Sequence, residues 1–304
     1  VCETAQRMGY RRNEAAVNLR RQLSKTIGIV IPEVVTSFFM SFIQWAQRDL
    51  RQQGYRTIIA VSNEEVTQER ECLQMLEQCR VDGILMSVCH QSANAALYQE
   101  IMSRGIPMVF FDRQVCGVEA SQVHIDDVSA SVFMVEKLIR SGCRRIVHLL
   151  GPEHIGNATD RLRGYREVLE KFKLPYNPQY VVAGGLSADE GAQAMEEFLQ
   201  RGLAFDAVFG FTETSVLGAK SVLQRMNFRI PDDVSLCCIS GTTLCTLVHP
   251  TLSAVEQPTE EMAHTACRLL LEQLATPGQC RPQTVVLHGE VVVRESTKAV
   301  QAQA

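Results

Sequence analysis

Asp126 and Asp127 are the first candidates for chemistry in this chain, because one carboxyl could donate a proton while its neighbour accepts one. They stand directly before residues 128–141, a segment whose apolar residues recur at helical spacing. At that position an aspartate more commonly caps the helix, by accepting hydrogen bonds from its first backbone N–H groups. The sequence favours capping and leaves the acid–base pair open.

No other group completes a catalytic set. The seven histidines lack ligand-like spacing, the eleven cysteines contain no CxxC pair, and the GxGxxG, Walker and GxSxG motifs are absent. We therefore expect no enzyme, no metal site and no cofactor.

The cysteines indicate the cellular compartment. They stand mostly within apolar runs, which is typical of small buried side chains in a reducing compartment, and so of a cytoplasmic protein. No signal peptide is present, and no apolar run reaches the roughly 20 residues of a membrane span.

A group of small polar side chains follows the segments that we expect to be strands. In parallel sheets, ligands bind beyond the carboxyl ends of the strands. Each such residue alone could equally be an ordinary loop residue, but together they suit hydrogen bonding to a small polar molecule. These residues are Ser37 and Phe38, Ser62 and Asn63, Ser87, Asp112 and Arg113, Asp126 and Asp127, Thr212 and Glu213, and Ser240.

The amino-terminal stretch differs in charge from the rest. Residues 1–26 carry six basic and two acidic side chains, whereas the remainder carries 24 basic and 32 acidic ones. A cationic end on an anionic body suggests a polyanion partner at that end. The alternative is a solvated tail, because the weakly amphipathic helix around Leu19 is too short to be stable alone.

Strands and helices alternate from Thr26 to the carboxyl end, which predicts parallel sheets covered by helices on both sides. The opening strand, residues 27–31, is apolar on both faces, and the helix after it carries an apolar stripe up to Leu50. Ser187 and Glu190 predict a capping box, and Gly142 and Gly202 predict helix ends. With 304 residues, we expect an α/β protein of two doubly wound parallel-sheet lobes. The other expected strands are residues 55–61, 81–88, 106–111, 122–125, 144–150, 180–184, 207–211, 234–240 and 285–293.

Several sequence segments, which follow one another in the same order as in that family, resemble the LacI/GalR (lactose-repressor) family of bacterial transcription regulators. They include GYRRNEAAVNLRR, KTIGIVIPE, RVDGILM, GIPMVFFDR, VHIDD, SGCRRIVHLLGP, RLRGY, IPDDVSL and LSAVEQP. The resemblance implies a ligand-responsive, homodimeric repressor that binds operator DNA and senses a small polar metabolite such as a sugar or sugar derivative. A solute-binding protein of a transport system, which has the same fold, is the alternative.

The resemblance also implies a domain plan. Residues 1–24 match the end of a helix-turn-helix domain and a hinge helix, and the start at Val1 suggests a truncated head. The body resembles periplasmic sugar-binding proteins. One lobe is expected from residues 25–125 and 258–286, and the other from residues 126–257 and 287–297. Residues 298–304 form a tail.

Candidate site residues follow from the strand-end rule and from the resemblance. For the effector they are Phe38, Phe39, Asn63, Ser87, Asp127, Arg161, Thr212, Glu213, Ser240 and Gln257. For DNA they are Tyr10, Asn13, Ala16, Leu19 and Arg20, with Leu19 matching the residue that wedges into the minor groove.

Two departures from the family pattern bear on the ligand. Thr212-Glu213 stands where many members have Asn-Asp, and Ser240 stands where they have an aspartate. With that carboxylate absent and Arg161 retained, the sequence suggests an anionic, oxygen-rich effector such as a sugar phosphate. A neutral sugar or a nucleobase remains an alternative. For the dimer, we expect a helix face with Trp45, Phe38 and Ser41 or Phe42 to be partly buried between protomers. The alternative is that Trp45 covers the sheet edge of its own lobe.

Overall fold

The computed structural model describes residues 24–299. The predicted helix-turn-helix remainder, the hinge helix and the DNA contacts at Tyr10, Asn13, Ala16, Leu19 and Arg20 lie outside the described residues. Between Ser24 and residue 299, no helix is both long and apolar enough to cross a membrane.

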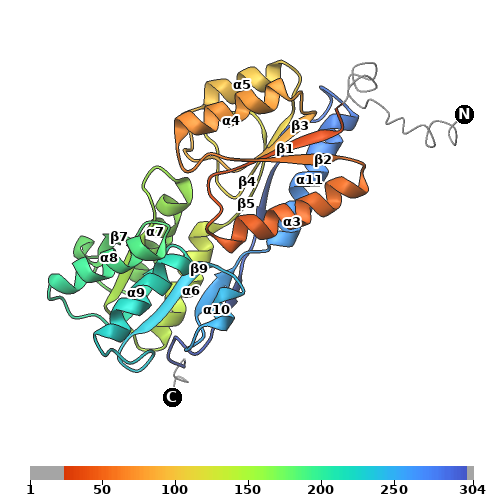
Figure 1. Ribbon diagram of the computed structural model, residues 1–304. Coiled ribbons are helices and arrows are strands. Elements are labelled where there is room, and N and C mark those ends of the chain that lie inside the picture. The colour runs from red at the N-terminus through yellow and green to blue at the C-terminus, as the bar shows by residue number, and fades with distance from the viewer. Residues whose placement is uncertain (1–23, 300–304) are drawn as a thin grey trace, which may run out of the picture.

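Two six-stranded sheets, each in its own half of the molecule, organise the described chain (Figure 1). In the first sheet all neighbouring strands pair in parallel. Its order is β11 (Thr284–Leu287), β5 (Ser121–Ile125), β4 (Met108–Phe111), β3 (Gly83–Met86), β1 (Thr26–Ile31) and β2 (Arg56–Val61).

The second sheet is parallel except at one edge, where β12 pairs antiparallel with β10. Its order is β12 (Glu290–Val292), β10 (Ser253–Glu256), β9 (Ser235–Gly241), β8 (Ala207–Gly210), β6 (Ile146–Leu150) and β7 (Val181–Ala183). The predicted fold class, two doubly wound α/β lobes, is confirmed.

Helices cover both faces of each sheet (Figure 1). Around the first sheet lie α3 (Ser37–Gln52), α4 (Val66–Gln78), α5 (Ala95–Ser103) and α11 (Thr259–Ala275). Around the second lie α6 (Asp127–Arg140), α7 (Gly156–Lys171), α8 (Ala188–Gln200), α9 (Glu213–Arg225) and two short segments, η1 (Pro178–Tyr180) and α10 (Leu244–Leu247).

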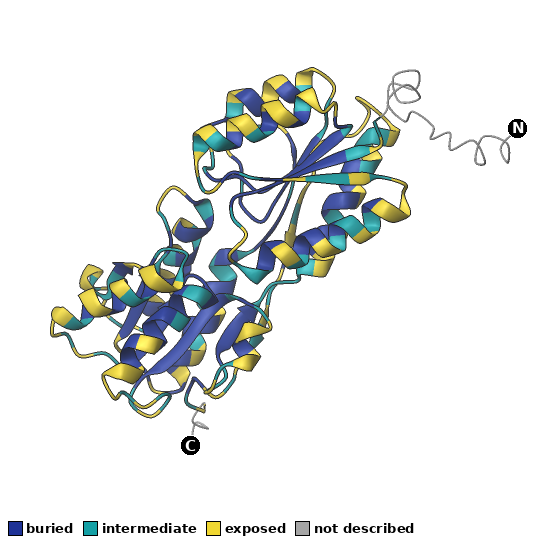
Figure 2. Ribbon diagram, in the orientation of Figure 1, coloured by how far each residue is buried: buried dark blue, intermediate teal, exposed yellow. Residues whose placement is uncertain are grey.

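Strand β1 is buried on both faces of the first sheet, as its apolar run predicts. Ile27, Ile29 and Ile31 pack toward the cluster that contains α3 and α11, whereas Val30 packs into the cluster on the opposite face. Figure 2 shows the same pattern in both halves, with buried strands inside and helices exposed on their outer faces. Asp126 caps α6 by accepting from the Ser129 amide at 2.9 Å, so the capping prediction is confirmed for this residue.

Other local predictions are confirmed too. Ser187 and Glu190 form a capping box at the start of α8. Gly142 and Gly202 follow α6 and α8 with φ of 101° and 65°, a conformation that favours glycine. The ten cysteines of residues 24–299 are free thiols, and six of them are buried, but Cys79, Cys116 and Cys280 are exposed.

The single strand predicted over 285–293 is wrong. The chain leaves β11 in the first sheet at Leu287 and enters β12 in the second sheet at Glu290. Gly289, between them, lies so close to the neighbouring strand that an added Cβ would be 2.5 Å from Val255. An apolar β-branched run has the same periodicity whether it stays in one sheet or passes between two. The four-residue β10 was not predicted at all.

The chain passes between the sheets three times, after β5, after β10 and after β11. We propose the lobe boundaries given above, with the last one moved to follow Leu287, where β11 ends.

Candidate functional site

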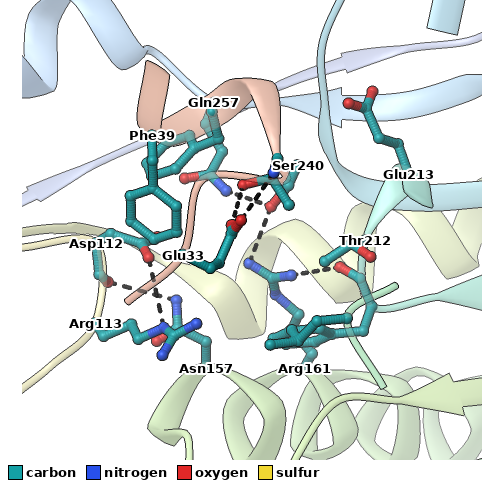
Figure 3. A pocket seen from close by; sticks show the side chains of 14 residues that line it. Glu33, Phe39, Asp112, Arg113, Asn157, Arg161, Thr212, Glu213, Ser240 and Gln257 are labelled. Atoms are coloured by element: carbon teal, nitrogen blue, oxygen red, sulfur yellow. Dashed lines mark hydrogen bonds and ion pairs between the residues drawn. The ribbon is translucent and has the colours of Figure 1, made fainter. Parts of the chain in front are cut away.

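A cavity lies between the two sheets, at the carboxyl ends of their strands (Figure 3). Its free volume is about 40 Å³, room for a few water molecules, so a larger ligand requires the two halves to move apart. We call it the inner cavity. Its lining comes from both halves of the molecule: Glu33, Thr36, Phe38, Phe39, Asp112 and Arg113 from the first, and Asn157, Arg161, Leu186, Phe211, Thr212, Glu213, Ser240 and Gln257 from the second.

Aromatic rings form two walls of the inner cavity. Phe39 packs edge-on against Phe38 and Phe111, with centroid separations of 5.1 and 6.4 Å. Phe211 lies under the guanidinium of Arg161, 4.3 Å from ring centroid to carbon. Phe39 offers an apolar surface on which the C–H face of a small ring could rest, whereas the Arg161 guanidinium covers a face of Phe211.

Arg161 is buried, and its guanidinium is already paired. Its Nε donates to Asp127 Oδ1 at 2.6 Å, its Nη1 donates to the carbonyl of Phe211, and its Nη2 reaches Ser240 Oγ at 3.4 Å. Burial raises the pKa of Asp127, and the Arg161 charge opposes that rise. Because Asp127 offsets the charge of Arg161, this arginine gives less support to an anionic effector than its presence in the sequence suggests.

Ser240 and Gln257 meet at the second-sheet side of the inner cavity. Ser240 adopts a φ of 60°, which turns the end of β9, and its Oγ accepts a hydrogen bond from Gln257 Nε2. Gln257 Oε1 is buried and has no hydrogen-bond partner within the described structure. A buried acceptor without a donor is costly, so this oxygen is suited to accept from a ligand hydroxyl.

Glu213 is the buried first residue of α9, and it is surrounded by donors. Its carboxylate accepts from the Thr242 amide at 2.8 Å, from the Thr242 hydroxyl at 2.5 Å and from the Cys245 thiol at 3.2 Å. Ser37, at the start of α3, donates to it at 3.2 Å and to Thr242 Oγ1 at 2.6 Å. Glu213 therefore connects the two halves of the molecule across the edge of the cavity.

Asp112 and Arg113 form the first-sheet side. Burial raises the pKa of Asp112 to about 7, although the neighbouring Arg113 charge opposes the rise. Arg113 makes a two-pronged ion pair with Glu64, both contacts being 2.7 Å. Asn157 donates to the backbone carbonyl of Asp112 at 3.4 Å, from the opposite half of the molecule.

Seven of the ten predicted effector residues line the inner cavity: Phe38, Phe39, Arg161, Thr212, Glu213, Ser240 and Gln257. Three do not. Asn63 is exposed and donates to Gln68 at 2.7 Å, Ser87 is fully buried in the first half, and Asp127 lies behind Arg161. The strand-end rule finds the right edge of a sheet, but it does not show which loop residues turn inward.

Other lining residues were missed or not selected. Asp112 and Arg113 follow a predicted strand, but they were not among the ten residues predicted to contact the effector. Asn157 stands one helical turn before Arg161 on α7, a spacing that could have identified it. Glu33, Thr36, Leu186 and Phe211 gave no separate signal.

The fold and this cavity define a class of protein: a two-lobed α/β binding protein with a polar site for a small molecule between its lobes. Residues 135–297 match the family model described as a periplasmic binding protein-like domain. The chain is 30% identical to "HTH-type transcriptional regulator CelR" of Thermobifida fusca, over 95% of this chain and 86% of that protein. It is 28% identical to "Ribose operon repressor" of Halalkalibacterium halodurans, over 98% and 87%.

A solved structure described as "transcriptional regulator CelR-cellobiose complex" superimposes with a TM-score of 0.82 and 29% identity, covering 97% of this chain and 88% of that one. The chain belongs to the LacI family of transcription regulators. It is a ligand-responsive regulator of transcription, and the alternative of a solute-binding protein for transport is set aside. Regulators of this family bind operator DNA and a small effector.

Proposed function

We propose that this regulator is a cytoplasmic, homodimeric repressor whose effector is a neutral, hydroxyl-rich small molecule of the sugar class. The effector would occupy the inner cavity, with Arg161, Asp112, Asn157 and Gln257 as its polar contacts. Phe39 and Phe211 would contact its apolar faces. The names of the relatives, a ribose operon repressor and a complex with cellobiose, support the sugar class.

The observation that carries this proposal is the pairing of the two cations in the inner cavity. Arg161 is bound to Asp127, and Arg113 is bound to Glu64. Glu33, Asp112 and Glu213 add further carboxyl groups to the lining. An anion would meet carboxylates with no unpaired cation to offset them. A polyol would supply hydroxyl donors to carboxylate and amide oxygens, and would receive hydrogen bonds from Asn157 and Arg161.

Coupling to DNA would follow from the position of the site. A ligand held by both halves favours one angle between them, and so changes the separation of the two amino-terminal segments in a dimer. Effector binding and operator binding are then linked, and the linkage is reciprocal.

The test is calorimetry with matched pairs of ligands: D-ribose and ribose 5-phosphate, D-glucose and glucose 6-phosphate, and cellobiose. We expect heat of binding only from neutral sugars, and at least about a tenfold loss of affinity in Gln257→Ala, because a buried hydrogen bond to the ligand is lost. Gln99→Ala, on the outer surface of α5, is the matched control. Tight binding of only the phosphorylated member of a pair would contradict the proposal and would support an anionic effector instead.

A further inference from the structure

A second cavity, which we call the vestibule, lies next to the inner cavity. The two share Glu33, Thr36 and Leu186 as lining residues, so these side chains stand between a ligand in one and a ligand in the other. The free volume of the vestibule is about 350 Å³. Its remaining lining consists of Val35, Glu64, Pro152, His154, Ser187 and Glu190.

Carboxylates surround the vestibule, and each already accepts hydrogen bonds. Glu33 accepts from the Thr36 amide at 2.9 Å, and Glu64 accepts both prongs of Arg113. Glu190 accepts from the Leu186 and Ser187 amides at 3.0 and 2.9 Å, as part of the cap of α8. These contacts hold the carboxylates in place. Arg113 offsets the charge of Glu64, so the negative charge of the rim comes from Glu33 and Glu190.

The floor of the vestibule is apolar. Val35 is 71% exposed although it is a large aliphatic residue. Leu186 and Pro152 lie at the same cavity, and the His154 ring stacks on His90 from the other half, with centroids 5.9 Å apart and planes 10° apart. The stacking fixes the orientation of the His154 ring. A neutral ring or chain with an apolar face would cover this surface and remove it from water.

We propose that the vestibule is a second subsite, which binds the outer part of a two-part glycoside: a neutral group with an apolar face, joined to the sugar ring in the inner cavity. This inference rests on the proposed sugar function and narrows its ligand class. The outer group is an apolar aglycone or the C–H face of a second sugar ring. The negative rim excludes a phosphorylated outer group.

The test uses calorimetry on the full chain with matched series. The probes are the methyl and phenyl β-glycosides of D-glucose, D-galactose and D-xylose, together with cellobiose, lactose and xylobiose. For the sugar that fits the inner cavity, we expect the phenyl glycoside or the disaccharide to bind at least about tenfold more tightly than the methyl glycoside. Higher affinity for the phenyl glycoside alone identifies an aglycone site. Higher affinity for the disaccharide identifies a second sugar site.

Two adjacent exposed valines supply a matched pair of variants. Val35→Glu places a charge on the vestibule floor, whereas Val34→Glu adds the same charge at a residue that is 53% exposed and lines neither cavity. Val35→Glu should abolish the higher affinity of the two-part ligand and leave the affinity for the methyl glycoside unchanged. Val34→Glu should change neither.

Equal affinities for methyl, phenyl and disaccharide ligands would overturn the subsite while leaving the sugar function intact. A gain that persists in Val35→Glu would place the outer group elsewhere and would also overturn it. If no glycoside or free sugar binds at millimolar concentration, the sugar function itself is wrong, and the vestibule inference falls with it.

Discussion

At the scale of single residues, the cleft depends on charges that are removed from solvent. Arg161 and Asp127 are each 2% exposed at the side chain and are joined at 2.6 Å. Asp112 is also buried, yet its Arg113 neighbour lies 3.9 Å away and is shared with Glu64. One carboxylate is therefore well compensated and the other is not. Their substitutions should consequently affect the stability of the protein in different ways.

Arg161→Ala should lower the free energy of unfolding by about 3–5 kcal/mol, because it leaves the Asp127 carboxylate buried without its partner. Urea denaturation measures this loss. Arg163→Ala, on the same helix with a side chain 59% exposed, should change stability by less than about 1 kcal/mol. Adding Asp127→Asn to Arg161→Ala should recover part of the loss. A double variant less stable than the single one would contradict the pairing.

Asp112 should make stability depend on pH. Its pKa in the folded protein, about 7, lies above the ordinary value of 3.8, so the folded state binds more protons than the unfolded state between these values. The contribution of Asp112 to the free energy of unfolding should therefore fall as pH rises through this window, by up to about 1.4 kcal/mol per unit.

Urea denaturation of the parent and of Asp112→Asn at roughly pH 5 and 8 tests this dependence, because the variant cannot titrate at that position. Between the lower and the higher pH, the free energy of unfolding of Asp112→Asn should rise relative to that of the parent. Asp232→Asn, at a side chain 68% exposed, should follow the parent. Parallel curves for Asp112→Asn and the parent would show that Asp112 is ionised throughout.

At the scale of elements, helix α3 joins the two halves through its first residue. The Ser37 hydroxyl reaches both Glu213 and Thr242, so the start of α3 is bound to the start of α9 and to the loop after β9. Because Glu213 retains its donors from Thr242 and Cys245 in any case, losing Ser37 would leave no buried charge unsatisfied. The contact therefore affects the angle between the halves more than the stability of either half.

Ser37→Ala should open the ligand-free protein. A hydrogen bond to a charged acceptor contributes about 1.5–3 kcal/mol, so the equilibrium constant for closing should fall by roughly tenfold or more. Small-angle scattering should then give a larger radius of gyration than for the parent. Ser103→Ala, at the exposed end of α5, is the control. Superimposable scattering curves for Ser37→Ala and the parent would rule out this contact as a determinant of closure.

At the scale of the whole molecule, one outer face joins both halves and carries uncovered apolar groups. A groove there is lined by Ser41 and Trp45 of α3 and by Thr243 and Thr246 around α10. Met40 beside it is 49% exposed and Leu247 is 73% exposed. Phe38 and Ser41 line this groove together with Trp45, as expected, whereas Phe42, the alternative to Ser41, is fully buried in the first core.

We propose this face, with Trp45 within it, as the dimer interface. Sedimentation should show a dimer at micromolar concentration, and Leu247→Glu should weaken it at least about tenfold, because a charge would be buried against apolar surface. Met226→Glu, at a residue 60% exposed at the end of α9, should leave the dimer intact. A parent protein that sediments as a monomer would exclude this interface.

The sequence by itself determined the local elements. Apolar spacing over a few residues distinguishes a strand buried on both faces, such as β1, from an amphipathic helix such as α3. Helix-capping hydrogen bonds join residues within four positions of each other. The Asp126 cap and the Ser187–Glu190 capping box could therefore be predicted from residue types and their spacing. The order of strands and helices then indicated two parallel sheets and the edge at which we expect a ligand.

Only the tertiary structure decided which groups meet. Asp127 and Arg161 are 34 residues apart, and Ser37 and Glu213 are 176 residues apart. Their contacts depend on the register of separate sheets and on how loops such as that at Ser240 turn, with a φ of 60°. No local pattern carries this information. For the same reason the change of sheet after Leu287 was missed, and so was the pairing that removes Arg161 as a free cation.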